Sequence, residues 1–325
     1  MRLVFMGTPE FANPSLRKLH QSSHQVVAVV TGQDKPVGRA RGGRGRKVEP
    51  PPVKRLAGKL GYPLLQPASL KDDRFQSHLA DMAADLLVVV AFRILPDALL
   101  SIPPRGAVNL HPSLLPGYRG AAPIQHCLLA GETITGVTTI ALTPQIDAGG
   151  ILLQREHPIH PLDDFGSLSE KLAHFGADLL VETLDGLEKE KITPRPQAEL
   201  GAGEVPTAPK IKPADLIIHW DRPAKAVVNQ VRAFSPGPGA ATFLDGRRLK
   251  LFEATAIDGE GEPGVVLGVS QARLQVGAGD GVLAVAELQI EGRRRMAIDE
   301  FLRGTHVEPG MVLGQEVDGH PRHGR

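Results

Sequence analysis

Three polar side chains stand where strands of a buried sheet are expected to end. Asn109 and His111 are two residues apart at the end of an apolar run, and Asp147 follows a second apolar run just before Gly149. Because side-chain direction alternates along a strand, Asn109 and His111 point to the same side. An amide and an imidazole can stabilise a developing oxyanion, and a carboxylate can orient the imidazole or accept a proton. Taken singly, these residues are more typical of strand capping and a turn, but together they suit acyl chemistry.

The elements that must position these residues alternate between apolar strands and amphipathic helices. Residues 3–6 and 26–30 are apolar runs of strand length, and residues 11–20 between them suit a helix. The same theme continues with helices at 53–60 and 72–82 and strands near 64 and at 85–91, 106–110 and 137–142. Continuous apolar strands alternating with helices predict an α/β fold with a Rossmann-like, doubly wound sheet. In such sheets ligands bind outside the carboxyl ends of the strands, where Asn109 and His111 would lie.

The second half of the chain changes character. Residues 165–187 form the longest predicted helix, with Asp164 and Ser167 as capping residues. Residues 191–213 are rich in proline, glycine and polar residues and predict a linker. After a helix at 222–233, short alternating runs separated by glycine turns predict a small antiparallel, OB-like β-barrel. We therefore expect a catalytic domain at 1–190, a linker at 191–213 and a β-barrel domain at 214–325.

Composition excludes several classes of protein. A chain of 325 residues is long enough for two domains, and 37 basic against 36 acidic residues leave a net charge of only +1. A single cysteine, Cys127, excludes an intramolecular disulfide framework and the usual cysteine-rich zinc sites. The apolar run at residues 1–6 is too short for a signal peptide or a membrane span. We expect a cytoplasmic protein that does not interact with membranes.

Several motifs resemble those of one enzyme family. The segment HPSLLPGYRGAAPI at 111–124 and the segment 140–150, which contains Asp147, are similar to the two signatures of the 10-formyltetrahydrofolate-dependent formyltransferases. The segments MGTPEFA at 6–12, APKIK at 208–212, NQVRAFSPGPG at 229–239 and FLRG at 301–304 most resemble the branch that acts on methionyl initiator tRNA. The resemblance thus covers nearly the entire chain.

The resemblance implies a reaction and roles for the three polar residues. A formyl group would pass from 10-formyltetrahydrofolate to the free α-amino group of methionine esterified to initiator tRNA. Asn109 and a protonated His111 would stabilise the oxyanion, while Asp147 would keep His111 protonated and relay the proton of the amine. No metal is needed for this chemistry.

The resemblance also implies a folate pocket. Residues 88–92 would supply one wall, although Phe92 and Arg93 stand where the family commonly has Tyr-Gly. The rest of the pocket is assigned to four consecutive residues: Ser113, Leu114, Leu115 and Pro116.

A cationic segment predicts contact with the tRNA backbone. Residues 35–47 interleave basic residues with glycine, which suits a loop that follows phosphates by charge or a plain solvated surface loop. In the family a loop at this place enters the acceptor arm of the tRNA, and Arg39 is the residue that matches it best. Arg41, in the same basic segment, is expected to bind tRNA beside Arg39. Lys210 and Lys212 in the linker extend the expected contact. By resemblance the protein would act as a monomer.

Three other functions account for only part of this sequence. A folate-dependent formyltransferase for a small amine predicts neither the basic loop nor a barrel-like C-terminal domain. A Rossmann-like RNA-binding module without chemistry needs no joint placement of Asn109, His111 and Asp147. A nicotinamide-dependent dehydrogenase is disfavoured because Gly7 is not followed by the two further glycines of the dinucleotide fingerprint.

Overall fold

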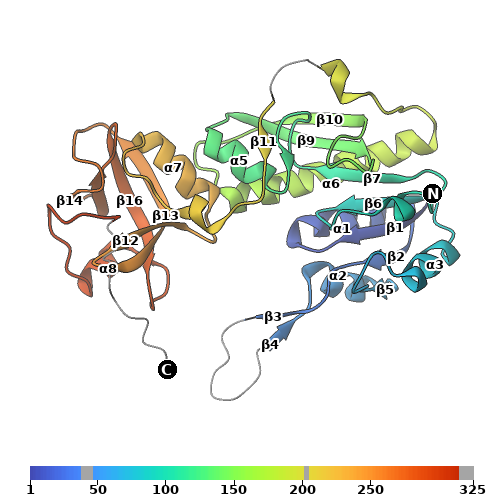
Figure 1. Ribbon diagram of the computed structural model, residues 1–325, viewed down its shortest axis with the longest axis horizontal. Coiled ribbons are helices and arrows are strands. Elements are labelled where there is room, and N and C mark those ends of the chain that lie inside the picture. Colours follow the sequence, from blue (N-terminus) through green and yellow to red (C-terminus); the bar gives the residue numbers. More distant parts are fainter. Residues whose placement is uncertain (38–46, 201–204, 315–325) are drawn as a thin grey trace. The chain divides into compact units, whose positions relative to one another are not determined.

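The computed structural model describes residues 1–37, 47–200 and 205–314, which form two compact units (Figure 1). The first unit comprises the described residues of Met1–Pro123, Ile134–Pro158 and Ser169–Ala208. The second comprises Ile124–Thr133, Ile159–Leu168 and the described residues from Pro209 onward. No helix in the described part of the chain is long and apolar enough to cross a membrane.

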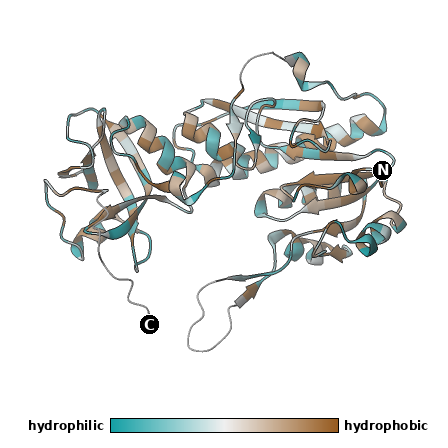
Figure 2. Ribbon diagram, in the orientation of Figure 1, coloured by the Kyte–Doolittle hydropathy of each residue, from teal (hydrophilic) through white to brown (hydrophobic). Residues whose placement is uncertain are grey.

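A mixed sheet forms the centre of the first unit. Within the described residues its strands are, in spatial order, β10 (Ile151–Pro158), β9 (Ile134–Ala141), β7 (Ala107–His111), β6 (Leu86–Val90), β1 (Arg2–Gly7), β2 (Gln25–Val30) and β5 (Leu64–Leu65). The five strands from β7 to β5 pair in parallel, whereas β9 and β10 are antiparallel to their neighbours. Apolar residues are concentrated along the central strands, as Figure 2 shows. The predicted Rossmann-like sheet is confirmed.

The strand order reverses at β1. From β1 the chain passes to β2 and β5 on one side, and then returns to add β6 and β7 on the other. This reversal is the topological switch point at which α/β sheets bind ligands beyond the carboxyl ends of their strands. His111 is the last residue of β7, and so lies at this edge of the sheet.

Helices bury both faces of this sheet. They include α1 (Asn13–Gln21), α2 (Pro52–Leu60), α3 (Asp73–Asp81), α4 (Asp97–Leu100) and much of α6 (Phe165–Glu188), with the short turn η1 (Glu10–Ala12) before α1. On one face, Phe75 and Leu79 of α3 and Leu99 of α4 pack with Leu87 and Val89 of β6. This apolar packing fixes the position of β6 in the sheet.

The longest helix begins and packs as its sequence predicts. The backbone N–H of Ser167 donates to Asp164 Oδ1 at 2.8 Å, and the backbone N–H of Asp164 donates to Ser167 Oγ at 3.2 Å. This reciprocal pair satisfies two N–H groups that an α-helix leaves free at its start. Further along α6, Gly176 lies so close to Leu110 of β7 that a Cβ there would be 2.8 Å from a leucine methyl.

The residues predicted as a linker pack partly on the first unit. Arg195 exchanges two backbone hydrogen bonds with Ile151, at 2.8 and 2.9 Å. The short strand β11 (Thr207–Ala208) pairs in parallel with β8 (Arg119–Gly120), and η2 (Gln197–Leu200) lies between these contacts in sequence. The segment therefore supplies structure to the turns around Arg119 rather than only connecting two domains.

An antiparallel sheet forms the second unit, as predicted. In the described residues its order is β12 (Ala240–Leu244), β13 (Arg247–Ile257), β16 (Val282–Ile290), β15 (Arg273–Gly277) and β14 (Val266–Ser270), with β17 (Met296–Ala297) beside β16. The segment 310–314 connects the two end strands, because Gly314 N–H donates to Phe243 of β12 and Val266 N–H of β14 donates to Met311. Elements α7 (Ala224–Ala233), α8 (Ile298–Arg303) and η3 (Pro213–Leu216) complete this unit, together with most of α5 (Pro123–Ala130).

A short hairpin precedes α2. Strands β3 (Lys35–Val37) and β4 (Lys47–Glu49) pair antiparallel. Residues 38–46, with Arg39 and Arg41, lie outside the described residues.

Candidate active site

Strand β7 presents Asn109 and His111 on one face of the sheet. Asn109 pairs with Val89 of β6 and Ile140 of β9, and His111 pairs with Thr138 of β9. His111 is 4% exposed, whereas Asn109 is half-buried. The period of two along the strand puts both side chains on the same side, as predicted.

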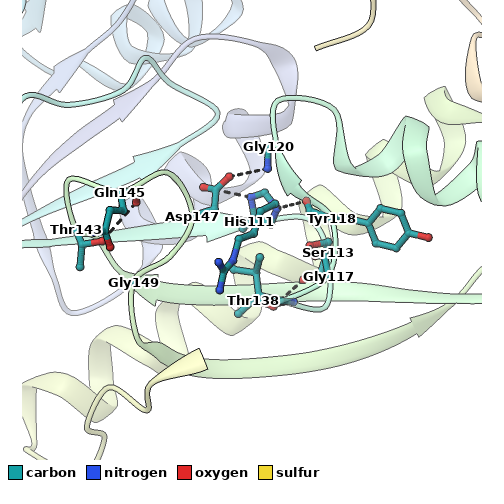
Figure 3. Close-up of polar contacts among 12 residues, drawn as sticks. His111, Ser113, Gly117, Tyr118, Gly120, Thr138, Thr143, Gln145, Asp147 and Gly149 are labelled. Atoms are coloured by element: carbon teal, nitrogen blue, oxygen red, sulfur yellow. Dashed lines mark hydrogen bonds and ion pairs between the residues drawn. The ribbon is translucent and has the colours of Figure 1, made fainter. Parts of the chain in front are cut away.

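The His111 ring lies between a carbonyl and a carboxylate (Figure 3). Its Nε2 is 3.0 Å from the backbone oxygen of Tyr118, and because a carbonyl can only accept, Nε2 carries the hydrogen. Its Nδ1 is 3.7 Å from Asp147 Oδ1, which is close enough for an ion pair but too long for a hydrogen bond. Nδ1 is therefore the ring atom that can gain or lose a proton beside Asp147.

Asp147 is held on a turn with an unusual backbone. Its φ is 50°, in the left-handed region that aspartate tolerates better than most residues. Its Oδ2 accepts a hydrogen bond of 2.9 Å from the backbone N–H of Gly120. The turn lies close against β9 at Gly149, where a Cβ would be 1.8 Å from the carbonyl oxygen of Ala141, so only glycine fits. The Asp-Ala-Gly-Gly sequence thus lets the chain return to β10 with the carboxylate facing His111.

Burial lowers the pKa of His111. Desolvation of the imidazolium is the largest cause, while the Asp147 carboxylate and the Tyr118 carbonyl raise the pKa in opposition. The balance favours the neutral ring near neutral pH. Burial thus works against the protonated His111 that the resemblance implies, because the ring is more deeply buried than a strand end suggests. A neutral Nδ1 makes His111 able to accept a proton.

A pocket opens where Asn109 and Asp147 meet. Apolar side chains make up much of its wall, among them Val89, Leu95 and Leu142. Phe92 and Arg93 also line it, so residues that follow β6 form a wall, as expected. The Arg93 guanidinium lies 5.3 Å from the centre of the Phe92 ring.

Hydrogen bonds to neighbouring residues hold the predicted folate-binding segment in place. Ser113 Oγ donates to the carbonyl of Gly117 at 2.8 Å, and the Ser113 carbonyl accepts from Thr138 Oγ1 at 2.6 Å. Gln154 Nε2 donates to the carbonyl of Leu115 at 2.9 Å. Ser113 and Leu115 are buried, whereas Leu114 and Pro116 are half-buried. The pocket beside Asn109 is lined by other residues, and folate binding by residues 113–116 stays a prediction.

The predicted tRNA-binding residues divide into two groups. Lys210 and Lys212 are exposed, and both are in the second unit. The Lys212 backbone N–H donates to Asp215 Oδ2 in the first turn of η3, and the Lys212 side chain is at the surface. Arg39 and Arg41 lie outside the described residues.

Two residues of the site were not predicted from sequence. Arg119 donates two hydrogen bonds to Gln197 Oε1, at 3.0 and 2.6 Å, and Gln197 Nε2 donates to the backbone of the Asp147 turn. Arg119 is within the segment 111–124 that carries the family resemblance, which was a usable signal. Gln197 is in the predicted linker, where composition alone gave no signal of a role at the site.

One cluster of potential metal ligands is present in the described part of the chain, and it is not at this site. His24 Nε2 lies 3.1 Å from Asp185 Oδ1, and Glu188 Oε1 pairs with the Met1 ammonium at 2.5 Å. His24 precedes β2 at the end of the parallel sheet opposite to His111. The Met1 ammonium already pairs with one of the two carboxylates there, that of Glu188.

Family models match most of the chain. The formyl transferase model matches residues 1–184, and the model of the formyl transferase C-terminal domain matches residues 210–306. Together with the site geometry, these matches show that the chain belongs to the formyl transferase family.

Curated relatives narrow the comparison. The chain is 45% identical over 316 residues to the methionyl-tRNA formyltransferase of Geobacter sulfurreducens, which covers 97% of either chain. It is also 45% identical over 320 residues to the methionyl-tRNA formyltransferase of Pelobacter propionicus, covering 98% of either chain.

Solved structures share the fold at low identity. HypX from Aquifex aeolicus in complex with tetrahydrofolic acid matches with a TM-score of 0.62 and 19% identity, over 93% of this chain and 47% of that one. An N-formyltransferase from Helicobacter canadensis in complex with folinic acid and dTDP-3-aminofucose matches with a TM-score of 0.62 and 16% identity, over 89% and 98%.

Proposed function

We propose that this protein transfers the formyl group of 10-formyltetrahydrofolate to the α-amino group of methionyl initiator tRNA. The observation that carries the proposal is the meeting of Asn109 and Asp147 in one pocket, with His111 Nδ1 3.7 Å from Asp147 Oδ1. An amide donor, a neutral imidazole and a carboxylate meet the requirements of transfer to an amine. The relatives at 45% identity carry the name of this activity.

The chemistry assigns one role to each catalytic residue. The amine nitrogen attacks the formyl carbon, and the carbonyl electron pair moves to the oxygen, where the Asn109 amide donates to the oxyanion. The amine proton passes to His111 Nδ1, and the resulting imidazolium is stabilised by Asp147. When the intermediate collapses, the proton passes to the folate nitrogen, which leaves with the electron pair of the broken carbon–nitrogen bond. The free enzyme thus starts with a neutral His111, and the reaction itself supplies the proton.

The folate is assigned to the pocket beside Asn109. Val89, Leu95 and Leu142 supply apolar surface for a flat ring system, and the Asn109 amide supplies polarity at the reacting end. Four residues that follow β7 in sequence are proposed to complete the binding site through their backbone: Ser113, Leu114, Leu115 and Pro116. The solved relatives bound to tetrahydrofolic acid and folinic acid are consistent with a folate ligand.

The acceptor tRNA is assigned to basic residues outside the pocket. Lys210 and Lys212 are exposed and can neutralise phosphates. Arg39 and Arg41 are proposed to act on the acceptor arm. In this proposal residues 1–190 carry the catalysis, 191–213 connect, and 214–325 bind tRNA, in a cytoplasmic monomer.

The experiment that tests this proposal compares acceptors. Purified protein is mixed with 10-formyltetrahydrofolate and, separately, with methionyl initiator tRNA, methionyl elongator tRNA or free methionine. We expect kcat/KM for the initiator tRNA to exceed that for the other two. Equal rates on free methionine and on charged tRNA would instead identify a small-amine formyltransferase.

A further inference from the structure

A buried glutamine ties the Asp147 turn to Arg119. Gln197 is 4% exposed, and its Nε2 donates to the backbone oxygens of Asp147 and Gly149, both at 2.8 Å. Its Oε1 accepts from Arg119 Nε at 3.0 Å and from Arg119 Nη2 at 2.6 Å. Two donors and two lone pairs are all that a side-chain amide has, so every hydrogen-bonding position of Gln197 is used.

The Asp147 turn needs such support. With φ at 50°, the Asp147 backbone is in the sparsely populated left-handed region, which costs an L-residue conformational free energy. The two carbonyls that Gln197 binds flank Ala148, so the amide fixes both ends of the turn. Gly120, whose N–H donates to the Asp147 carboxylate, is next in sequence to Arg119. The Gln197 side chain is thus bonded to the segments on both sides of that hydrogen bond, at Arg119 and at the Asp147 turn.

We propose that Gln197 is a positioning residue that keeps the Asp147 carboxylate beside His111 Nδ1. The inference rests on the proposed function, because the importance of this distance comes from the proton transfer assigned to His111. Gln197 is not among the residues that line the pocket beside Asn109, and it bonds the turn only through backbone atoms of Asp147 and Gly149. Its effect on the reaction is therefore exerted through Asp147.

The segment that carries Gln197 is anchored independently of its side chain. Arg195 exchanges backbone hydrogen bonds with Ile151, and the carbonyl of Pro206 accepts from the N–H of Tyr118 at 2.6 Å. Replacing Gln197 therefore removes the amide bonds without detaching the segment. This makes a single substitution informative.

Two substitutions separate the two sides of the amide. Gln197→Met keeps the length of the side chain and removes all four hydrogen bonds. Gln197→Glu keeps an acceptor for Arg119 but turns oxygen toward the carbonyls of Asp147 and Gly149. Both variants should release the Asp147 turn, whereas only Gln197→Met frees Arg119.

A matched control exists in the second unit. Gln230 is also 4% exposed, and its Nε2 donates to the backbone oxygens of Asp215 and Ile217, both at 2.9 Å. Gln230→Met loses the same kind of buried hydrogen bonds but leaves the Asp147 turn intact. Urea unfolding of all variants measures the cost to stability.

The readouts are the kcat and KM values and the pKa of His111. We expect both Gln197 variants to lower kcat by about 10- to 100-fold, as displacement of a catalytic group does, with KM for the folate little changed. Because Asp147 raises the pKa of His111, we also expect that pKa to fall in both variants. It is measured by NMR titration of ¹³Cε1-labelled histidine, with His111→Asn to assign the signal. Gln230→Met should leave the His111 pKa and the pH profile of kcat unchanged.

Three outcomes would overturn the inference. The Gln197 variants could lose stability like Gln230→Met while keeping the wild-type His111 pKa and kcat, which would make the role merely structural. Gln197→Glu could behave like wild type, which would place the effect on Arg119. A kcat loss shared by Gln230→Met would indicate a general effect of destabilisation. The NMR titration needs no substrate, so it tests the positioning role even if the wild-type protein transfers no formyl group.

Discussion

Substitution of Asp147 by asparagine removes one charge and almost nothing else. The amide oxygen of asparagine can still accept from the Gly120 N–H, and asparagine adopts the left-handed backbone region as readily as aspartate. We therefore expect the free energy of unfolding to change by no more than about 1 kcal/mol. The substitution should mainly remove the electrostatic stabilisation of the imidazolium that forms at His111 during the reaction.

The size of that loss follows from the distance between the charges. Two unit charges about 4 Å apart attract by about 4 kcal/mol at an effective dielectric of about 20, and His111 Nδ1 is 3.7 Å from Asp147 Oδ1. This corresponds to about 1,000-fold in rate as an upper limit. Because the proton is only partly transferred in the transition state, we expect kcat for Asp147→Asn to fall by about 10²- to 10³-fold.

The assay is formyl transfer to methionyl initiator tRNA at saturating folate, with Asp245→Asn as the control. Asp245 also has a positive φ, of 49°, but it is an exposed turn residue between β12 and β13. The control should keep wild-type kcat. Near-normal turnover by Asp147→Asn, or by Asp147→Ala, would refute the assigned role of the carboxylate.

Three further predictions follow from the same structure. Because burial lowers the pKa of His111 and of His24, the unfolded chain binds more protons below about pH 6.5. The free energy of unfolding should therefore fall as pH drops below that value, and urea unfolding of His111→Asn should show a shallower fall; an unchanged slope would contradict the burial argument. Gly149→Ala forces a Cβ against a carbonyl oxygen of β9, so it should lower both the melting temperature and kcat, as calorimetry and the transfer assay would show; a wild-type melting temperature would contradict the packing. Replacing Lys210 and Lys212 by alanine should raise KM for charged tRNA and reduce the salt dependence of binding by about one unit of slope per lysine, which a titration at several salt concentrations measures; an unchanged slope would remove these lysines from the interface.

The central strands and the positions of Asn109 and His111 on them were predictable because their signals are local. Strands at 85–91 and 106–110 are continuous apolar runs, and the structure forms β6 and β7 there. The alternation of side-chain direction along β7 predicts that Asn109 and His111 are on the same face of the sheet. The helix at 165–187 carries its own capping pair in Asp164 and Ser167, and α6 begins at Phe165.

Features that depend on contacts distant in sequence were not predictable. Strand β10 mixes apolar and charged residues because one of its faces is exposed, so it has no continuous apolar run. The role of Gln197 depends on bonds to Asp147, 50 residues earlier in the chain. The protonation state of His111 depends on the depth of its burial, which neither residue type nor spacing reveals. These three features arise only when separate segments pack together.

The most direct test of the proposed function is a single-turnover experiment with the wild-type protein. Methionyl initiator tRNA and 10-formyltetrahydrofolate are mixed with excess protein, and the amino acid is released from the tRNA by base and identified by mass spectrometry. We predict that formylmethionine appears in an amount equal to the charged tRNA, together with tetrahydrofolate in equal amount. Methionine recovered without a formyl group would contradict the proposed function.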